Sequence, residues 1–315
     1  MSSQKGRVLI TGGSGFVGAH IANRFLAGGW EVVLFDLRPP ELELPPAFPR
    51  AVEFVQGNVL GVDELAEAIS AHSINGIVHS AAVVGDVRAE EQPALAFDIN
   101  VRGTFNALEA ARLRNLRFTY ISTATLYGQK EDREPVRESD LPDPVGMYDG
   151  TKYMGEVLAH SYHKAYAVDA VSLRPGFLYG PGSNIGHYYL DRLVRGESLR
   201  GVPGADHYCD FTYIKDFAEG VYLAHTTRPL ANRVFNISSR QYFSRAHFAK
   251  VVATVLGGDV EIKLGSGLPA RAHQRGPSDN SRAAAEFGYE PRYDLEAGLR
   301  DWLAWLRKQE SQGVR

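Results

Sequence analysis

Short apolar runs alternate with longer amphipathic stretches along most of the chain. Such runs are typical of strands that are buried on both faces of a parallel sheet. The predicted strands cover residues 8–10, 31–35, 52–55, 76–79, 118–121, 170–174 and 234–237. Helices are predicted from about residue 16, over 64–71, 93–114 and 148–166, and near the C-terminal end. This alternation predicts an α/β fold with a doubly wound parallel sheet.

The helix predicted over residues 93–114 begins at Pro93, a residue that the first turn of a helix tolerates. Its apolar stripe consists of Phe97, Val101, Phe105 and Leu108. The helix connects the fourth and fifth predicted strands, as a crossover in a parallel sheet requires.

Three glycines, Gly12, Gly15 and Gly18, follow the first predicted strand at a spacing of three residues. Gly12 permits a sharp turn, Gly15 lets the backbone approach a pyrophosphate, and Gly18 lets the helix pack closely on its strand. The start of that helix offers free N–H groups and the positive end of a dipole to the pyrophosphate. Asp36 follows the second strand, where the dinucleotide-binding fingerprint has its acidic residue. The stretch therefore predicts a dinucleotide site on a Rossmann sheet.

Asp36 favours NAD over NADP as the dinucleotide. Its carboxylate can accept hydrogen bonds from both adenosine ribose hydroxyls, whereas it would repel the 2′-phosphate of NADP. Arg38 stands two residues further on and could reach a 2′-phosphate. The alternative for Arg38 is a solvated side chain at the start of a proline-rich loop, and we favour this alternative because Asp36 keeps the nearer position.

The alternation of strands and helices loosens beyond Gly180. We expect residues 1–175 to form the NAD-binding domain, with segments near 209–240 returning to it. Residues 176–315 would form mainly a smaller α/β substrate-binding region. Within it, residues 182–208 suit a segment that covers the substrate, and residues 265–282 are either a loop over a ligand or a solvated loop.

Composition narrows the class of protein. The chain has 315 residues, 44% of them hydrophobic, and a net charge of −3 with both signs spread along it. No basic nucleic-acid surface is indicated, and no apolar run approaches the length of a membrane span. Cys209 is the one cysteine, so an internal disulfide is excluded. We expect a cytoplasmic protein without a signal peptide, a metal, a nucleic-acid partner or a membrane anchor.

Tyr148 and Lys152 lie four residues apart on one predicted helix and therefore share a face. A lysine ammonium near a phenol favours the phenolate and lowers the phenol pKa from about 10. Such a phenol can act as a general base toward an alcohol. Thr123 follows the strand at 118–121, and its hydroxyl can bond the reacting oxygen. The alternatives are a chance surface pair for Tyr148 and Lys152 and simple strand-end capping for Thr123.

At these residues the chain resembles the extended short-chain dehydrogenase/reductases, the NAD-dependent epimerase/dehydratase group. The resemblance runs from Val8 to about Leu306, and Tyr148 with Lys152 matches the family's Y-x-x-x-K. The other matching motifs are TGGSGFVG from Thr11, HSAA from His79, NVRGT from Asn100, STATLYG from Ser122, RPGFLYGPG from Arg174 and DFTYIKD from Asp210.

The resemblance implies a role for each site residue. Tyr148 is the base or acid on the substrate hydroxyl, Lys152 holds the nicotinamide ribose, and Thr123 shares the substrate oxygen. A hydride passes between the carbon that bears this oxygen and C4 of the nicotinamide. The residues implied to bind NAD are Gly12, Gly15, Phe16, Val17, Gly18, Asp36, Asn58, Val59, Ala81, Ala82, Asn100, Lys152, Pro175 and Gly176. Thr123, Phe177 and Arg275 are candidate substrate contacts.

The resemblance also implies a homodimer. Family members commonly pair through the helix before the fifth strand and the helix that bears Tyr148. The second helix carries Met154, Val157, Leu158 and Tyr162 away from the face of Tyr148. This apolar surface needs cover, which either a second copy of the chain or its own sheet would supply.

Departures from the family pattern bear on the substrate. Ala124 and Thr125 replace the Asp and Glu of the family's dehydratases, which argues against dehydration and for a sugar 4-epimerase. However, Phe177 replaces an Asn, and Cys209 replaces an Arg that contacts phosphate in nucleotide-sugar enzymes. Both replacements remove anchors for a diphosphate.

Three functions are compatible with these residues. We favour an NAD-dependent oxidoreductase acting on a secondary alcohol of a small hydroxylated substrate, such as a sugar or sugar acid. The alternative is a nucleotide-sugar 4-epimerase that retains NAD. Arg271, Arg275 or Arg282 would then supply the positive charge that Cys209 does not, unless all three are ordinary surface arginines. A non-catalytic dinucleotide sensor is the least favoured function, since a sensor needs no base.

Overall fold

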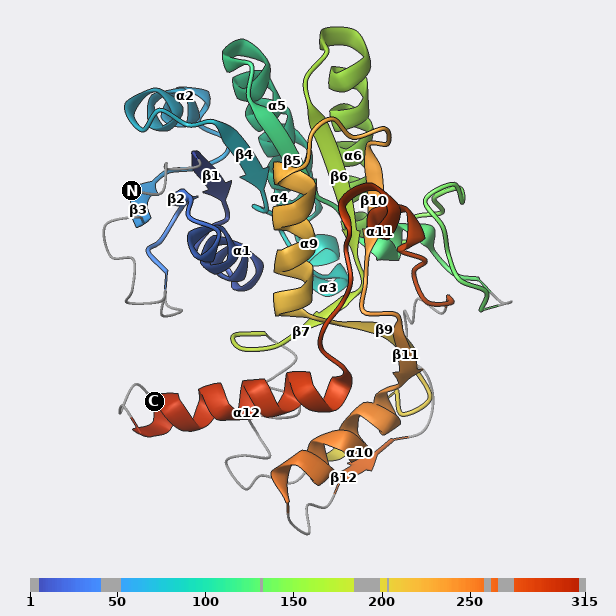
Figure 1. Cartoon of the computed structure of the whole chain (residues 1–315). Coiled ribbons are helices and arrows are strands. Elements are labelled where there is room, and N and C mark those ends of the chain that lie inside the picture. Colours follow the sequence, from blue (N-terminus) through green and yellow to red (C-terminus); the bar gives the residue numbers. More distant parts are fainter. Residues whose placement is uncertain are drawn as a thin grey trace.

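The computed structural model describes residues 6–40, 52–130, 133–183, 199–202, 204–257, 262–265 and 275–311. Its main layer is a seven-stranded parallel sheet in the order β3-β2-β1-β4-β5-β6-β10 (Figure 1). The strands are β1 (Arg7–Thr11), β2 (Glu31–Asp36), β3 (Val52–Gln56), β4 (Gly76–His79), β5 (Arg117–Ile121), β6 (Ala170–Pro175) and β10 (Val234–Ile237). The strand order reverses between β1 and β4, as in Rossmann sheets. The predicted doubly wound α/β fold is confirmed.

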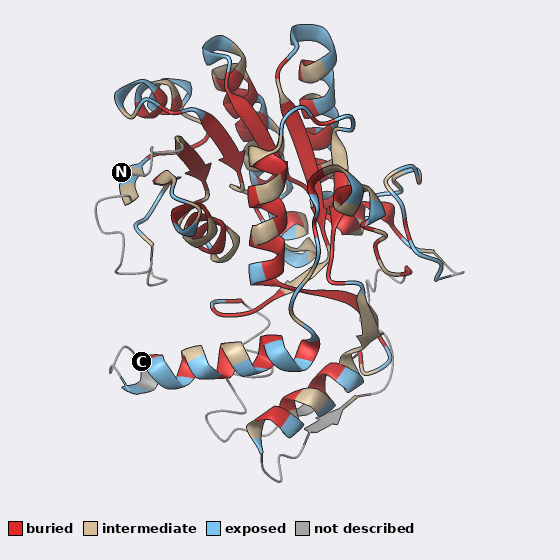
Figure 2. Cartoon of the chain, viewed as in Figure 1, coloured by how far each residue is buried: buried red, intermediate tan, exposed pale blue. Residues whose placement is uncertain are grey.

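Helices cover both faces of this sheet. They are α1 (Phe16–Ala27), α2 (Val62–Ala71), α5 (Gly103–Arg114), α6 (Met147–Tyr166) and α9 (Ile214–Thr226). Val8 and Ile10 of β1 pack in one core with α1 and α9, whereas Leu9 packs in a second core with α2, α5 and α6. Side chains alternate in this way because successive residues of a strand point to opposite faces. Figure 2 shows the central strands buried between the helices.

The helix predicted over residues 93–114 contains a π-helical turn. It consists of α4 (Pro93–Phe97), the π turn η1 (Asp98–Arg102) and α5, and the short α3 (Asp86–Glu91) precedes it. The predicted apolar stripe is wrong for two of its members, because Phe97 and Phe105 are each 44% exposed. Asn100 of the π turn and Leu108 of α5 are fully buried and face the interior.

The apolar residues on the outer side of α6 fall into two groups. Tyr162 is buried and contacts Phe105 edge-on with ring centres 6.2 Å apart, and Leu158 packs against the sheet core. Met154 and Val157 are 48% and 46% exposed. The protein itself therefore covers Leu158 and Tyr162, whereas Met154 and Val157 stay exposed to solvent.

A smaller region extends from the carboxyl end of β6 (Figure 1). Its strands are β7 (Phe177–Tyr179), β9 (Tyr208–Tyr213) and β11 (Gln241–Ser244) in one sheet, and β8 (Leu199–Val202) with β12 (Ile262–Leu264) in another. Its helices are α10 (Arg245–Leu256) and α12 (Leu295–Ser311), which pack on each other, whereas α11 (Ser281–Phe287) lies beside β10. Residues 184–198 of the predicted covering segment and 266–274 of the distal loop lie outside the described residues.

The chain passes between the two regions several times. β6 leads into β7 through Gly176, and β9 leads directly into α9, which packs beside α1. Among the described residues, none of the helices combines the length and apolar character that crossing a membrane requires.

Candidate active site

The glycine loop between β1 and α1 leaves room for a ligand at the start of the helix. Gly12 has a φ of +66°, and a side chain there would meet the backbone of Ala81 at 2.7 Å. A Cβ on Gly18 would collide with the carbonyl of Gly12. A Cβ on Gly15 would instead meet only the oxygen of Gly12, at 3.4 Å, and Gly15 is exposed. The loop therefore fits a pyrophosphate that approaches the backbone at Gly15.

Asp36 is fixed at the end of β2 beside this loop. Its Oδ2 accepts a hydrogen bond from the backbone N–H of Ser14 at 3.0 Å, and its Oδ1 accepts one from Leu37 at 2.7 Å. The carboxylate is thus oriented beside the turn that would hold the pyrophosphate. Arg38 is exposed.

The other predicted cofactor residues, apart from Asn100, lie at the same edge of the sheet. They are Phe16 and Val17 at the start of α1, Asn58 and Val59 after β3, Ala81 and Ala82 after β4, and Pro175 with Gly176 at the end of β6. Asn100 is fully buried, and its amide bonds both backbone groups of Val83 and, at 2.9 Å, the hydroxyl of Thr151. Asn100 thus braces the loop after β4 against α6.

Thr123, Tyr148 and Lys152 come together where β5 ends and α6 begins. The Tyr148 phenol lies close enough to the Thr123 hydroxyl for that hydroxyl to act on its pKa. Lys152 follows one helical turn later, is 2% exposed, and lies with its Nζ 4.3 Å from the centre of the Tyr120 ring. The three side chains can therefore act on one oxygen and on a cofactor beside it.

The pKa values of the pair differ from the sequence-based prediction. Burial, followed by the charge of Asp149, raises the pKa of Tyr148, although the hydrogen bond from Thr123 opposes this. Burial lowers the pKa of Lys152 to about 7, against the opposing charge of Glu156. The predicted lowering of the Tyr148 pKa by Lys152 is therefore wrong for the protein without cofactor, because desolvation dominates and raises it.

Most of the chain matches one known enzyme family. The model of the "NAD dependent epimerase/dehydratase family" matches residues 8–238. The chain belongs to this family. The "Probable UDP-glucuronate 4-epimerase" of Rhizobium meliloti is 29% identical over 95% of this chain and 96% of its own length.

Solved structures of relatives have the same fold as this chain. A UDP-glucuronic acid 4-epimerase from Bacillus cereus, in complex with UDP-glucuronic acid and NAD, has a TM-score of 0.82 at 26% identity and covers 96% of this chain and 99% of its own. A UDP-glucose 4-epimerase from Thermotoga maritima shares the fold, with a TM-score of 0.87 at 24% identity over 96% of this chain and 99% of its own. The protein is an NAD-dependent enzyme of the extended short-chain dehydrogenase/reductase type.

A buried ion pair between Glu156 and Arg174 lies next to the candidate active site. Glu156 lies one turn beyond Lys152 on α6 and is 4% exposed. Its Oε2 accepts hydrogen bonds from Arg174 Nε at 3.0 Å and from the Ser122 hydroxyl at 2.9 Å. Arg174 also donates to the hydroxyl of Tyr127 at 2.8 Å. This pair was not predicted from the sequence, although the spacing of four residues between Tyr148, Lys152 and Glu156 was a signal for it.

Arg275 is a buried arginine on the candidate substrate side of the epimerase/dehydratase fold. Arg275 is 8% exposed, and its Nε has no hydrogen-bond partner within the described part of the chain. Burial lowers its pKa, whereas the charges of Asp210 and Asp149 act in the opposite direction. Phe177 is half-buried and packs edge-on against Phe211 with ring centres 5.4 Å apart. Cys209 is buried.

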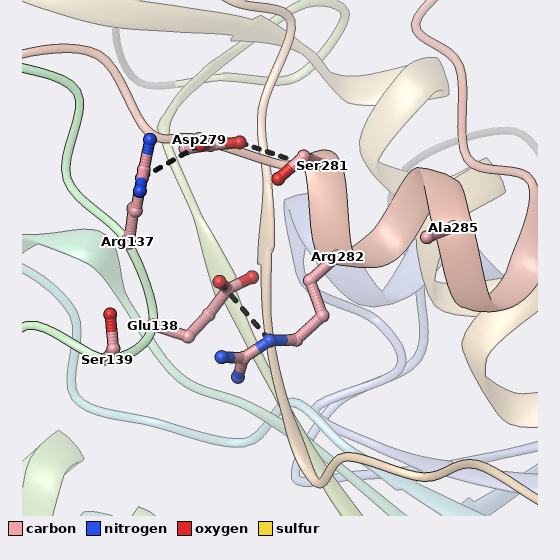
Figure 3. A pocket seen from close by; sticks show the side chains of 7 residues that line it. All are labelled: Arg137, Glu138, Ser139, Asp279, Ser281, Arg282 and Ala285. Atoms are coloured by element: carbon pink, nitrogen blue, oxygen red, sulfur yellow. Dashed lines mark hydrogen bonds and ion pairs between the residues drawn. The ribbon is translucent and has the colours of Figure 1, made fainter.

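The other candidate arginines lie elsewhere. Arg271 is outside the described residues. Arg282 pairs with Glu138 at 3.6 Å in a polar surface hollow of about 470 Å³ (Figure 3). In the same hollow, Arg137 pairs with Asp279 at 3.2 Å. Apart from Arg282 the hollow contains no predicted site residue, and its charges are paired with one another, so Arg275 is the better candidate for an anion contact.

The lowered pKa of Lys152 predicts how stability without cofactor depends on pH. Between pH 7 and 10.5 the unfolded chain binds the lysine proton and the folded protein releases it, so the free energy of unfolding rises with pH in this window. We expect Lys152→Met to remove this rise. Urea denaturation of both proteins from pH 6.5 to 9.5 measures the difference, and parallel curves would contradict it.

Proposed function

We propose that the protein is an NAD-dependent 4-epimerase of nucleoside diphosphate sugars. The observation that carries this proposal is buried Arg275, whose Nε lacks a partner within the described residues and whose charge interacts with Asp149 beside Tyr148. A guanidinium in this position suits a diphosphate and would supply the ionic anchor that the thiol of Cys209 cannot. The relatives named above act on UDP-sugars, which supports the same substrate class.

We further propose that the predicted residues keep their roles. Residues 1–175, with β10 and α9, would hold NAD through the glycine loop, Asp36 and Lys152, and residues 176–315 would bind mainly substrate. Bound NAD would supply a hydride acceptor and donor. Tyr148 would take the proton of the substrate hydroxyl and return it, while Thr123 bonds the same oxygen. The single, buried Cys209 supports a cytoplasmic location.

A second candidate is a dehydrogenase for a secondary alcohol without a nucleotide. Phe177 and Cys209 favour it, because both present apolar surface where nucleotide-sugar enzymes of the family have an amide and a guanidinium. The two candidates differ in the fate of the hydride. An epimerase returns it to the opposite face of the sugar, whereas a dehydrogenase releases reduced cofactor.

One assay separates the two candidates. The protein with NAD is incubated with UDP-glucuronate, UDP-glucose, the corresponding free sugars and the corresponding sugar acids. Sugar epimers are quantified by chromatography and NADH by absorbance. We expect epimers of a nucleotide sugar without net NADH. Net NADH from a free sugar would instead favour the dehydrogenase, and Tyr148→Phe serves as the inactive control.

We expect a preference for NAD over NADP that depends on Asp36. Asp36→Ala should narrow the difference in affinity, because it removes both the ribose contact and the repulsion of a 2′-phosphate. Calorimetric titration of both cofactors measures this, with Arg38→Ala as the matched control. Equal or tighter binding of NADP by the unaltered protein would assign the choice to Arg38.

We also propose a homodimer that pairs through α4, α5 and α6. The exposed side chains of Phe97, Phe105, Met154 and Val157 support it, because large apolar groups gathered on neighbouring helices are typical of an interface. Phe105→Glu should shift the mass in light scattering from dimer to monomer at micromolar concentration. Leu141→Glu is the control, since Leu141 is 83% exposed in the loop before α6. A monomer mass for the unaltered protein would reject the dimer.

A further inference from the structure

The ammonium of Lys152 lies over the face of a buried aromatic ring. Its Nζ is 4.3 Å from the centre of the Tyr120 ring. Tyr120 is fully buried in β5, three residues before Thr123, and Lys152 is 2% exposed. An ammonium at this distance is attracted to the negative face of an aromatic ring, and the attraction is strongest where water is excluded. The ring is therefore in place to stabilise the charged form of the lysine.

The hydroxyl of Tyr120 contacts the backbone of the same lysine. It donates a hydrogen bond to the carbonyl oxygen of Lys152 at 3.0 Å. A side chain at Gly155 would collide with this hydroxyl, so the glycine leaves the space on α6 that the hydroxyl occupies. Burial raises the pKa of Tyr120 well above 10, which keeps the phenol protonated and its ring uncharged. Tyr120 thus contacts both the backbone and the ammonium of Lys152.

The carboxylate one turn beyond Lys152 is paired with another cation. Both oxygens of Glu156 accept hydrogen bonds from the guanidinium of Arg174, and Oε2 also accepts one from the Ser122 hydroxyl. Glu156 favours the charged form of Lys152, but burial outweighs its effect and lowers the lysine pKa to about 7. The field of Glu156 alone therefore does not keep the lysine charged.

The imidazole beside Tyr120 is uncharged. His79 of β4 stacks on the Tyr120 ring, with ring centres 6.1 Å apart and an angle of 18° between the planes. Thr104 donates its hydroxyl proton to the carbonyl of Asn100 at 2.6 Å, so it accepts from Nε2 of His79 at 3.1 Å. Burial lowers the pKa of His79 to about 3, and the charge of Lys152 acts in the same direction. His79 therefore adds no positive charge beside the ammonium.

The other charged and titratable groups on the elements around Lys152 are unaffected by a substitution at position 120. Tyr148 and Asp149 precede it on α6, Asp86 of α3 acts on Tyr148, and Arg275 acts on Asp149. The remaining groups form ion pairs of their own, Asp98 with Arg102 on η1 and Glu109 with Arg112 on α5. A change in the titration of Lys152 in such a variant therefore reports on the ring.

We propose that Tyr120 is a positioning residue for Lys152: its ring face holds the ammonium and keeps it charged inside the buried site, and its hydroxyl fixes the backbone of the same lysine. The charged lysine then has N–H donors for the nicotinamide ribose. This role of Tyr120 rests on the proposed function of Lys152 in holding that ribose. A leucine would fill much of the same core volume, but it would lack the negative face.

Fluorination of the ring tests the contact while the shape is kept. Tyr120→Phe keeps the negative ring face, whereas 3,4,5-trifluorophenylalanine at position 120 has nearly the same size and a much weaker negative face. Lys152 is titrated in the protein without cofactor by NMR of lysine labelled with ¹³C at Cε, and Lys152→Met identifies its signal. We expect the midpoint in the trifluoro variant to lie about 1 pH unit below that in Tyr120→Phe. Equal midpoints in these two variants would overturn the proposal.

Phe118 provides the matched control. It lies two residues earlier on β5, is fully buried and also stacks on His79, with ring centres 5.8 Å apart. The same fluorinated residue at position 118 alters the same core, whereas the ammonium lies over the Tyr120 ring. We expect the midpoint of Lys152 to stay unchanged in this control. A fall as large as that in the position 120 variant would assign the effect to the core in general and would overturn the proposal.

NAD binding gives a readout that a general structural defect would not reproduce. If the charged lysine holds the ribose, lowering its midpoint by 1 pH unit weakens binding about tenfold above the midpoint and leaves binding below it unchanged. We therefore expect the trifluoro variant to bind NAD about tenfold more weakly than Tyr120→Phe at pH 8 and equally at pH 5.5, as measured by calorimetry. A loss of the same size at both pH values, or no loss at pH 8, would overturn the proposal.

Neither measurement requires turnover of a sugar, so the proposal and the proposed function can fail separately. If the unaltered enzyme forms no epimer of a nucleotide sugar while the lysine midpoint and NAD binding follow the ring, only the proposed function is rejected. If epimers form while the lysine midpoint and NAD binding are independent of the ring, only the role of Tyr120 is rejected.

Discussion

Tyr148→Phe should lower turnover by at least about 10³-fold while NAD binding changes only a few-fold. General acid–base groups contribute factors of about 10²–10⁴, and Tyr148 is the proposed proton carrier on the reacting oxygen. The phenylalanine ring keeps the packing of the phenol but has no proton to transfer. Single-turnover kinetics and calorimetry with NAD measure the two quantities separately.

A matched control for this prediction is Tyr153→Phe on the same helix. Tyr153 packs beside the small cluster around Leu126 and Val136. Its turnover should stay near that of the unaltered enzyme. Activity of Tyr148→Phe within a few-fold of the unaltered enzyme would refute the assignment.

Arg174→Met should lower the free energy of unfolding by about 3–5 kcal/mol, the cost typical of removing one partner from a buried ion pair. The carboxylate of Glu156 would keep only the Ser122 hydroxyl among the partners described above. Burial alone would lower the pKa of Arg174, but the hydrogen bonds and charge of Glu156 outweigh burial and raise it. The two charges therefore depend on each other.

The double variant Arg174→Met/Glu156→Gln distinguishes charge from packing. Removing both charges should recover part of the stability, because no uncompensated carboxylate stays buried. Chemical denaturation of all three variants measures this. A double variant less stable than Arg174→Met would contradict the argument.

The sequence predicted those features that depend on local pattern. The seven strands of the main sheet each contain a short apolar stretch, and the spacing of Gly12, Gly15 and Gly18 indicates a turn whose geometry depends on three neighbouring positions. Tyr148 and Lys152 share a helix, so their proximity follows from helical periodicity alone.

The features that were missed depend on contacts between distant segments or on local irregularity. Asp149 meets Thr125 across 24 residues, and Arg174 meets Glu156 across 18 residues. The π turn at Asp98–Arg102 and the outward-facing Phe97 and Phe105 depart from the regular period of 3.6 residues on which the prediction was based. Helix α9 begins at Ile214, directly after strand β9 ends at Tyr213, so neither a loop nor a side-chain cap marks its start.

β10 and α9 are synthesised after the other strands and helices of the large sheet, and this order constrains folding during synthesis. When the first 175 residues have left the ribosome, β6 is still an open edge and α1 still lacks the helix that packs beside it. Apolar groups such as Phe25 and Leu173, which are fully buried in the finished core, then lack part of their cover. The nascent chain is therefore most prone to aggregation until about residue 237 has emerged. A chaperone that covers exposed apolar side chains would have its largest effect in this interval.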